Sequence, residues 1–268
     1  MISNRTDNES VTDVTVTEES TPIQNEFQVV YILTYAPTNE LKTTYVNSLA
    51  TTIRYAMLNG IKVIPYILSG VENASMAKNE LLNNLRGIEY HSAVFIAHDI
   101  AWDPISFVQN LTSKEDVVGL PVVKKRMNNV IFDLDLNIDY VEKNDEGLIK
   151  VNYASLGFLT LKKKIIDDLL DSSPSITNNT GNEVKNVFEY QIKDGQSLSD
   201  NIVICNKIKD YKYDIWLNPN STCAQMTDNL YAVDFMTTVF PQPQEQSQAE
   251  LGTETPLPAS DDIKSLYE

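Results

Sequence analysis

Residues 27–68, "FQVVYILTYAPTNELKTTYVNSLATTIRYAMLNGIKVIPYIL", decide the fold class because their periodicity changes twice. Residues 27–33 are almost continuously apolar and rich in β-branched side chains, which is typical of a strand that is buried on both faces, and residues 61–68 predict a second strand. The segment between them is longer and more polar. The order of strand, helix and strand over residues 27–68 predicts the first unit of a parallel sheet.

The segment between these strands predicts an amphipathic helix. Thr38 or Asn39 is its expected N-cap, and Gly60 lies just past its end. Its apolar side chains recur four residues apart, and we expect them to pack on the sheet. They are Leu41, Tyr45, Leu49, Ile53 and Met57.

The same alternation continues along the chain. The expected helices cover residues 75–87, 103–112, the second half of 156–171, and 199–210. The expected strands cover residues 92–97, 116–123, the first half of 156–171, and 213–217, with loop and hairpin at 126–152. This order predicts an α/β fold in which helices flank a mostly parallel sheet.

The two ends of the chain differ from its middle. Residues 1–26 and 241–268 each contain one basic and six acidic residues, so they contribute −10 of the formal charge of −16. Their polar composition predicts a disordered N-terminal tail and a Pro/Gln-rich C-terminal linker and tail. We expect a single domain at 27–240, with the acidic tails available to a protein partner.

Charge and composition exclude several functions. A net charge of −16 does not suit binding to nucleic acid. The sequence contains no apolar run long enough to span a membrane, and residues 1–26 lack the apolar stretch of a secretory leader. With only two cysteines, Cys205 and Cys223, which we expect to be buried thiols, the sequence predicts a cytoplasmic protein.

The clearest candidate for chemistry is Asp99, in "FIAHDIAWDP" at residues 95–104. Ligands of open α/β sheets bind beyond the carboxyl ends of the strands, where Asp99 is expected. A carboxylate there could hold a divalent cation on a diphosphate. Alternatively, Asp99 or Asp103 caps the helix that begins near Pro104.

Two other stretches contain candidate functional residues. Gly157, inside an apolar run, predicts a close approach of the backbone to a neighbour or a ligand, although a bulge would also explain it. Asp194, Asp200 and Asn201 precede or open a helix, where Asp200 could either cap the helix or act in a site.

Taken together, these pieces resemble a small GT-A-type glycosyltransferase of the family-2-like sort, which bacteria, phages and large viruses often encode. The resemblance covers about residues 27–240, with weak individual motifs. The matching stretches are "MAKNELL" with Lys78 and Asn79, "FIAHDIAWDP" with His98, Asp99 and Trp102, "VVGLPVVKK" with Lys124 and Lys125, "YASLGFLTLKKKIIDDL" with Gly157 and Phe158, "LSDNIVICNKI" with Asp200 and Asn201, "DIWLNP", and "TCAQMTDNLYAVDF" with Gln225.

The resemblance implies a GT-A, Rossmann-like fold and a nucleotide-sugar donor. In that family a pair of carboxylates and a closing His bind Mn²⁺ or Mg²⁺, and an acidic pair supplies the base. Here Ala97 stands where the first carboxylate is expected, Asn201 stands at the base position, and Gln225 stands in place of the His. An amide cannot accept a proton at neutral pH.

Two hypotheses follow from this pattern. The first is a glycosyltransferase in which Asp99 positions the cation or the donor, Asp200 serves as base, and Lys78, Lys124 or Lys125 offset the diphosphate charge with little or no metal. The second is an inactive fold of the same kind, used as a binding or assembly module. The donor sugar and the acceptor, whether sugar, lipid or protein, are not specified by the sequence.

Overall fold

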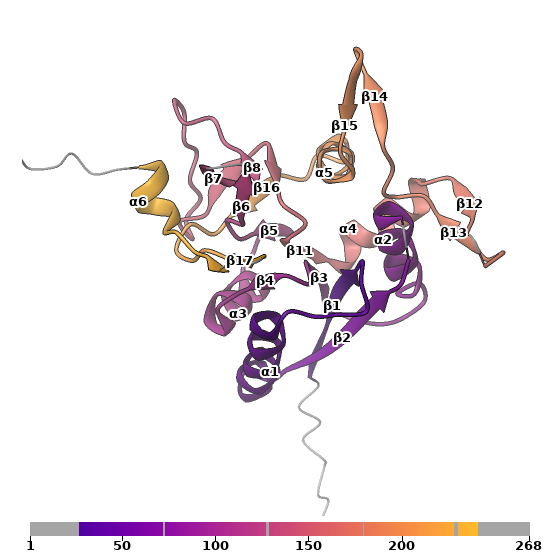
Figure 1. The fold of residues 1–268 in the computed structure, drawn as a ribbon, viewed down its shortest axis with the longest axis horizontal. Coiled ribbons are helices and arrows are strands. Elements are labelled where there is room, and N and C mark those ends of the chain that lie inside the picture. The colour runs from indigo at the N-terminus through magenta and orange to yellow at the C-terminus, as the bar shows by residue number, and fades with distance from the viewer. Residues whose placement is uncertain (1–26, 72, 127–128, 179, 228–229, 241–268) are drawn as a thin grey trace, which may run out of the picture.

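A seven-stranded sheet forms the centre of the molecule (Figure 1). The computed structural model describes residues 27–71, 73–126, 129–178, 180–227 and 230–240. The strand order is β2 (Ile61–Ser69), β1 (Gln28–Ala36), β3 (Ser92–Ile96), β11 (Phe158–Lys162), β5 (Val117–Gly119), β16 (Ile215–Leu217) and β9 (Ile149–Val151).

Strand direction confirms the predicted mostly parallel sheet. β1 pairs in parallel with both β2 and β3, and β5 pairs in parallel with β16. β11 lies antiparallel between β3 and β5, so all five of these other strands point the same way. β9 is antiparallel to β16 at the edge. The carboxyl ends of the five parallel strands therefore meet the start of β11 at one edge of the sheet.

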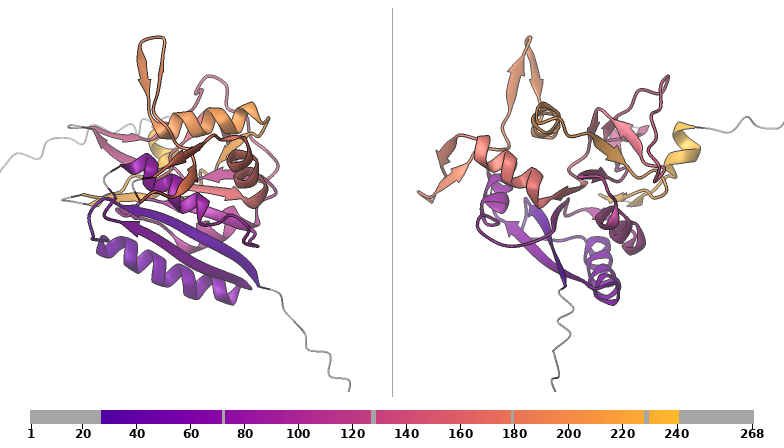
Figure 2. Two further views of the ribbon diagram at one scale, coloured as in Figure 1. Left: turned by 90° about the vertical axis from the view of Figure 1, so that its right-hand side faces the viewer. Right: turned by 180° about the vertical axis from the view of Figure 1, so that it is seen from behind.

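Helices cover both faces of the sheet, so the described residues form one three-layered domain (Figures 1 and 2). On one face lie α1 (Thr43–Leu58) and α3 (Pro104–Thr112), whose buried side chains share a core cluster with Val30 and Ile32. On the other face lie α2 (Ala74–Asn83), α4 (Lys163–Ser172) and α5 (Asp200–Asp210). The short α6 (Phe235–Val239) follows the last strand.

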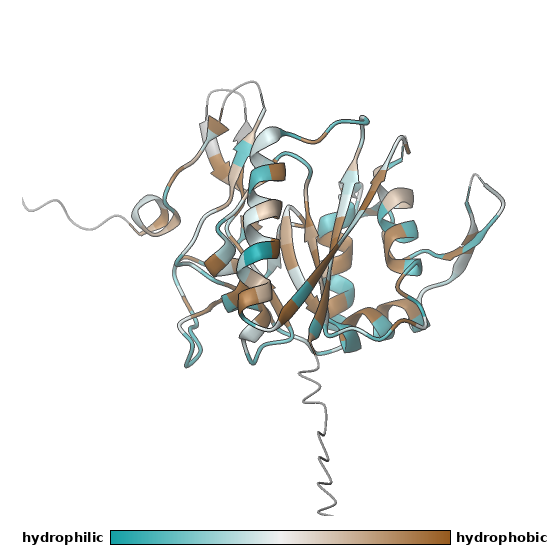
Figure 3. Ribbon diagram, turned by 90° about the horizontal axis from the view of Figure 1, so that it is seen from below, coloured by the Kyte–Doolittle hydropathy of each residue, from teal (hydrophilic) through white to brown (hydrophobic). Residues whose placement is uncertain are grey.

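The strands supply side chains to both layers. Along β1, Tyr31 and Leu33 pack toward α2 and α4, whereas Val30 and Ile32 pack toward α1 and α3. Successive side chains of a strand point to opposite faces, so a strand between two helical layers must be apolar throughout. Figure 3 shows this difference, since the central strands are mostly hydrophobic while the helices alternate along their length.

Shorter strands form the rim of the sheet. They are β4 (Ile100–Ala101), β6 (Val123–Arg126), β7 (Asn129–Phe132), β8 (Leu134–Asp135), β10 (Tyr153–Ala154), β12 (Ser175–Thr177), β13 (Glu183–Lys185), β14 (Gln191–Lys193), β15 (Gln196–Leu198), β17 (Ala224–Met226) and β18 (Leu230–Tyr231). The hairpin of β14 and β15 projects from the body of the molecule (Figure 2). The strand expected at 116–123 is two strands, β5 and β6, because Pro121 lies between them and has no N–H for a ladder.

The prediction for the first helix is wrong in its start and at Met57, while Leu41, Tyr45, Leu49 and Ile53 pack against the core as expected. α1 begins at Thr43, and its N-cap, Lys42, makes no side-chain capping bond. Its fully buried side chains are Tyr45, Ser48, Thr52 and Ala56, while Met57 is 49% exposed. Residues four apart drift by about 40° per step around a helix, so a strict four-residue repeat leaves the buried face.

The tails predicted at 1–26 and 241–268 lie outside the described residues, so the domain boundaries and the proposed partner contact stay predictions. Among the described helices, none is both long enough and apolar enough to cross a bilayer. Cys205 and Cys223 are buried free thiols, as expected. Burial raises the pKa of Cys205 to about 11.

Candidate functional site

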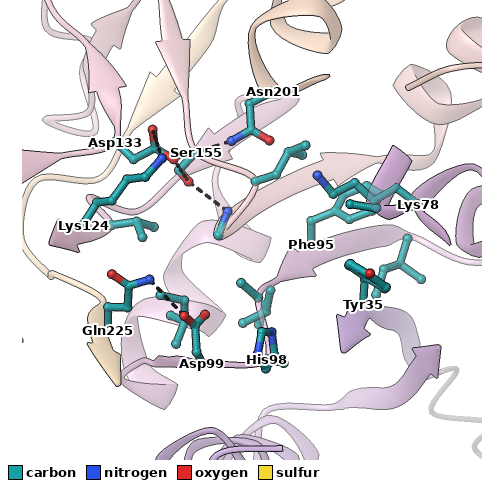
Figure 4. Close-up of a pocket in the computed structure, with 18 of the residues that line it drawn as sticks. Tyr35, Lys78, Phe95, His98, Asp99, Lys124, Asp133, Ser155, Asn201 and Gln225 are labelled. Carbon is teal, nitrogen blue, oxygen red and sulfur yellow. Dashed lines mark hydrogen bonds and ion pairs between the residues drawn. The ribbon is translucent and has the colours of Figure 1, made fainter. Parts of the chain in front are cut away.

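A cavity of about 270 Å³ opens at the edge of the sheet where the parallel strands end (Figure 4). β1 and β3 contribute their carboxyl ends, the segment after β5 contributes Lys124, and the turn before β11 contributes Gly157. The first turns of α2 and α5 contribute Ala74 and Asn201. Elements far apart in sequence therefore meet at the position expected for the ligand site of an open α/β sheet.

The cavity has an apolar side and a polar side. Leu33, Tyr35 and Phe95 form the apolar part, and Lys78 lies beside them (Figure 4). The polar side is formed by His98, Asp99, Lys124, Asp133, Ser155, Asn201 and Gln225. A ligand that suits this cavity has both a flat or apolar part and a part rich in polar groups.

Asp99 lines the cavity and does not cap the following helix. The cap of α3 is Asp103, whose Oδ2 accepts a hydrogen bond from the Ser106 amide at 2.9 Å. Asp99 Oδ2 instead accepts a hydrogen bond from Gln225 Nε2 at 2.9 Å. β17 pairs with β4 and places Gln225 beside Asp99, although the two are 126 positions apart.

Asp200 lies behind the wall of the cavity, and Lys78 holds it there. Lys78 Nζ is 2.6 Å from Asp200 Oδ2, and the two side chains are only 17% and 8% exposed. Ser75 Oγ donates to the same oxygen at 3.3 Å, and the Asn201 amide donates to Oδ1 at 2.9 Å. The predicted base is thus present next to the cavity, but a buried lysine is its direct partner.

Asp133 is a cavity residue that the sequence analysis missed. It follows β7, in the segment that was expected to be loop and hairpin. Its carboxylate accepts hydrogen bonds from Tyr153 Oη and, at 2.7 Å, from Ser155 Oγ. The only available signal was an aspartate directly after a short alternating strand, which is common in surface loops as well.

Gly157 connects the Asp133 network to the Asp99 loop. Its amide donates to Ser155 Oγ at 3.0 Å, and its carbonyl accepts from the Ala97 amide at 3.1 Å. A Cβ at this position would lie 3.0 Å from Val122 Cγ1. The expected close approach of the backbone is therefore found, and the close neighbour is protein.

Besides Asp200, three predicted site residues do not reach the cavity, because packing and hydrogen bonds occupy their side chains. Asn79 Nδ2 and Oδ1 bond to the carbonyl and amide of Phe188. Trp102 is 5% exposed, and its Nε1 donates to Thr52 Oγ1 at 2.8 Å. Phe158 is fully buried against Trp102 and Phe107. These three residues shape the core instead of touching a ligand.

Of the other predicted positions, some line the cavity and some do not. His98, Lys124 and Asn201 line the cavity. Asp194 does not, since it lies in the exposed turn of the β14–β15 hairpin with a φ of 52°. The backbone of Lys125 pairs with Val130 in the β6–β7 hairpin.

The side chains at Asp99 do not fit the Mn²⁺ or Mg²⁺ centre that the resemblance implies. Within the described residues, no three His, Cys, Asp or Glu side chains gather as metal ligands. Beside Asp99, the position of the expected His holds Gln225, whose amide N–H points at the carboxylate. A hydrogen-bond donor competes with a cation for the same oxygen.

The two lysines of the cavity differ in their availability. Lys78 is mostly buried in its pair with Asp200. Lys124 is 56% exposed, and its Nζ lies 3.8 Å from Asp133 Oδ1, which is a loose pair. Lys124 is therefore the cation of this cavity that is better placed to meet an anionic ligand.

The sequence matches no protein-family model and no curated protein. Among solved structures, the chain is similar to A197 from STIV, with 12% identity, a TM-score of 0.46, and coverage of 75% of this chain and 87% of that one. It is also similar to the inositol-1-phosphate CTP transferase from T. maritima, with 10% identity, a TM-score of 0.38, and coverage of 75% and 89%. A third is a glucose-1-phosphate thymidylyltransferase from Bacillus anthracis, with 10% identity, a TM-score of 0.33, and coverage of 55% and 76%. These scores are too low to support any inference about function.

Proposed function

We propose that this protein binds a nucleotide sugar in the cavity and acts as a glycosyltransferase. The observation that carries the proposal is the convergence of Lys124, Asp99 and Asp133 at the carboxyl ends of the parallel strands, beside an apolar wall. Lys124 would contact the diphosphate, and the nucleobase of the donor would pack against the apolar wall around Tyr35 and Phe95. The volume is at the small end of the range of roughly 300–1,000 Å³ for ligand pockets, so part of the donor would lie in the mouth.

In the transfer, the acceptor hydroxyl oxygen attacks the anomeric carbon as the bond to the diphosphate breaks. The bonding electrons leave with the diphosphate, and the hydroxyl proton passes to a carboxylate. Asp99 lines the cavity and can take that proton directly. Asp200, the base expected from the resemblance, can do so only after it parts from Lys78.

A second candidate is a module of the same fold that binds but does not react. The Lys78–Asp200 pair and the side chain of Asn201 favour it, since Lys78 already occupies the Asp200 carboxylate and a side-chain amide cannot accept a proton at neutral pH. Both candidates share the binding step and differ only in release of free nucleotide.

The test is calorimetric titration of the full chain with UDP-glucose, UDP-N-acetylglucosamine, GDP-mannose and dTDP-glucose, with and without Mn²⁺, followed by an assay for released nucleotide. Lys124→Met should weaken binding by about tenfold to a hundredfold, because a hydrogen bond to a charged group contributes roughly 1.5–3 kcal/mol. Lys62→Met, an exposed lysine on β2, is the matched control. Absence of binding to all four donors would reject the function, and binding without nucleotide release would select the module.

A further inference from the structure

We propose that Asp133 is a ligand-binding residue that accepts hydrogen bonds from sugar hydroxyls, and that Tyr153 and Ser155 position it. The inference rests on the proposed function and adds the chemistry that the polar side of the cavity recognises. Asp133 has no counterpart in the motifs of the resemblance.

The directions of the hydrogen bonds show that Asp133 is only an acceptor. The Gly157 amide donates to Ser155 Oγ, so the hydroxyl hydrogen of Ser155 points to Asp133 Oδ2. The Tyr153 hydroxyl donates to Oδ1. Burial, followed by the neighbouring Asp133, raises the pKa of Tyr153 far above its ordinary value, so this hydroxyl keeps its proton. The carboxylate is therefore held in one orientation by two neutral donors.

The network orients the negative charge without neutralising it. Lys124 Nζ is 3.8 Å away on a half-exposed side chain, and Asn201 Nδ2 reaches Oδ2 only at 3.5 Å. A carboxylate offers about four lone-pair sites, and the described neutral donors are three. Asp133 lines the cavity with 16% of its side chain exposed, so the remaining acceptor capacity faces the ligand.

An acceptor fixed in this way selects a ligand that donates hydrogen bonds. Phosphate oxygens are acceptors, so they are better placed against Lys124 than against Asp133. An ammonium ligand would have to lie beside that same lysine and would be repelled. Hydroxyl groups satisfy both neighbours, because they can donate to Asp133 and accept from Lys124. The hydroxyls can come from the ribose of a nucleotide or from a sugar.

The test compares the wild-type chain with Asp133→Asn, using Asp135→Asn as the matched control. Asp135 is exposed on β8 two positions away and does not line the cavity, so it undergoes the same charge change outside the site. The probes are UDP-glucose, UDP and 2′-deoxy-UDP by calorimetry, and free glucose, galactose and mannose by saturation-transfer NMR. Asp133→Asn should weaken UDP-glucose binding by tenfold or more, and Asp135→Asn should leave it unchanged.

The set of probes distinguishes the two possible sources of the hydroxyls, the ribose and the sugar. Equal losses for UDP and UDP-glucose, with no loss for 2′-deoxy-UDP, would assign the ribose. A loss confined to UDP-glucose and the free sugars would assign the sugar. If the wild type binds no nucleotide sugar but shows monosaccharide signals that Asp133→Asn abolishes, the proposed function fails and this inference stands. Unchanged binding of every probe by Asp133→Asn, or no binding of any probe by the wild type, would overturn it.

Tyr153→Phe keeps the carboxylate and removes one of its positioning donors. It should reduce affinity for the hydroxyl-bearing probe less than Asp133→Asn does, with no effect on a probe that lacks the recognised hydroxyls. A purely structural role would lower thermal stability and reduce affinity for all probes alike. That pattern would contradict the positioning role of Tyr153.

Discussion

Asp200 lies in the first turn of α5 and Asp133 contacts that turn through Asn201, but the two carboxylates face different surroundings. Asp200 lies behind the cavity wall with Lys78 at 2.6 Å, whereas Asp133 lines the cavity and is held mainly by the neutral hydroxyls of Tyr153 and Ser155. The first carboxylate is charge-compensated by the protein, and the second keeps its charge for a ligand. A motif position therefore locates a carboxylate near a site, but the packing around it decides whether it is accessible.

Among the tests of this difference, Lys78→Met has the largest expected effect. It would leave Asp200 buried without its cation, and the loss of one partner of a buried pair costs about 3 kcal/mol or more in the free energy of unfolding. Urea unfolding monitored by circular dichroism measures this cost. The double variant Lys78→Met with Asp200→Asn should recover much of the loss. A loss below about 0.5 kcal/mol, the level of exposed pairs, would show that Asp200 does not depend on Lys78.

A second test acts on the Asp133 side through Gly157→Ala. The new Cβ would lie 3.0 Å from Val122 Cγ1 and 3.1 Å from Ser155 Oγ, so the turn that carries Ser155 must move. Overpacking of this kind costs about 1–3 kcal/mol of stability, and loss of the Ser155 contact should also weaken nucleotide-sugar binding. Unfolding and calorimetry on the same preparation measure both effects. Unchanged binding despite lower stability would uncouple Gly157 from the site.

The smallest effect concerns pH and Tyr153. Its pKa in the folded protein is raised above the unfolded value near 10, so its contribution to stability is full below pH 10 and is lost as the pH rises further. Tyr153→Phe should therefore lose less stability than the wild type between pH 9 and 11. Urea midpoints across this interval measure it, and identical slopes for the two proteins would contradict the buried, neutral hydroxyl beside Asp133.

Much of the fold was predictable because strands and helices differ in periodicity. The runs that became β1 and β3 are apolar and buried over most of their length, and this pattern requires a helical layer on each face. The stripe of α1 was predicted less well, since Ser48 and Thr52 are buried by hydrogen bonds to Trp102 rather than by hydrophobicity. Polar residues with such partners give no periodic signal.

The candidate site was predictable only in part. Asp99, His98 and Lys124 follow strands that end at the ligand edge of the sheet, so their positions follow from strand order. Asn79, Trp102 and Phe158 are close in sequence to the cavity residues Lys78, Asp99 and Gly157, but they point into the core because neighbouring residues of a strand or helix face different directions. Asp133 gave no specific signal, because an aspartate after a short strand is common in surface loops and its donors come from β10 and the turn before β11.

The sequence by itself determined the order of the elements, the two helical layers and the edge of the sheet at which polar strand ends gather. Only the tertiary structure decided that β11 lies antiparallel between β3 and β5, that β17 brings Gln225 to Asp99, and that Lys78 takes Asp200 away from the cavity. Periodicity records how each segment is buried along its own length. The pairing of charges and hydrogen bonds between distant segments depends on how those segments pack together.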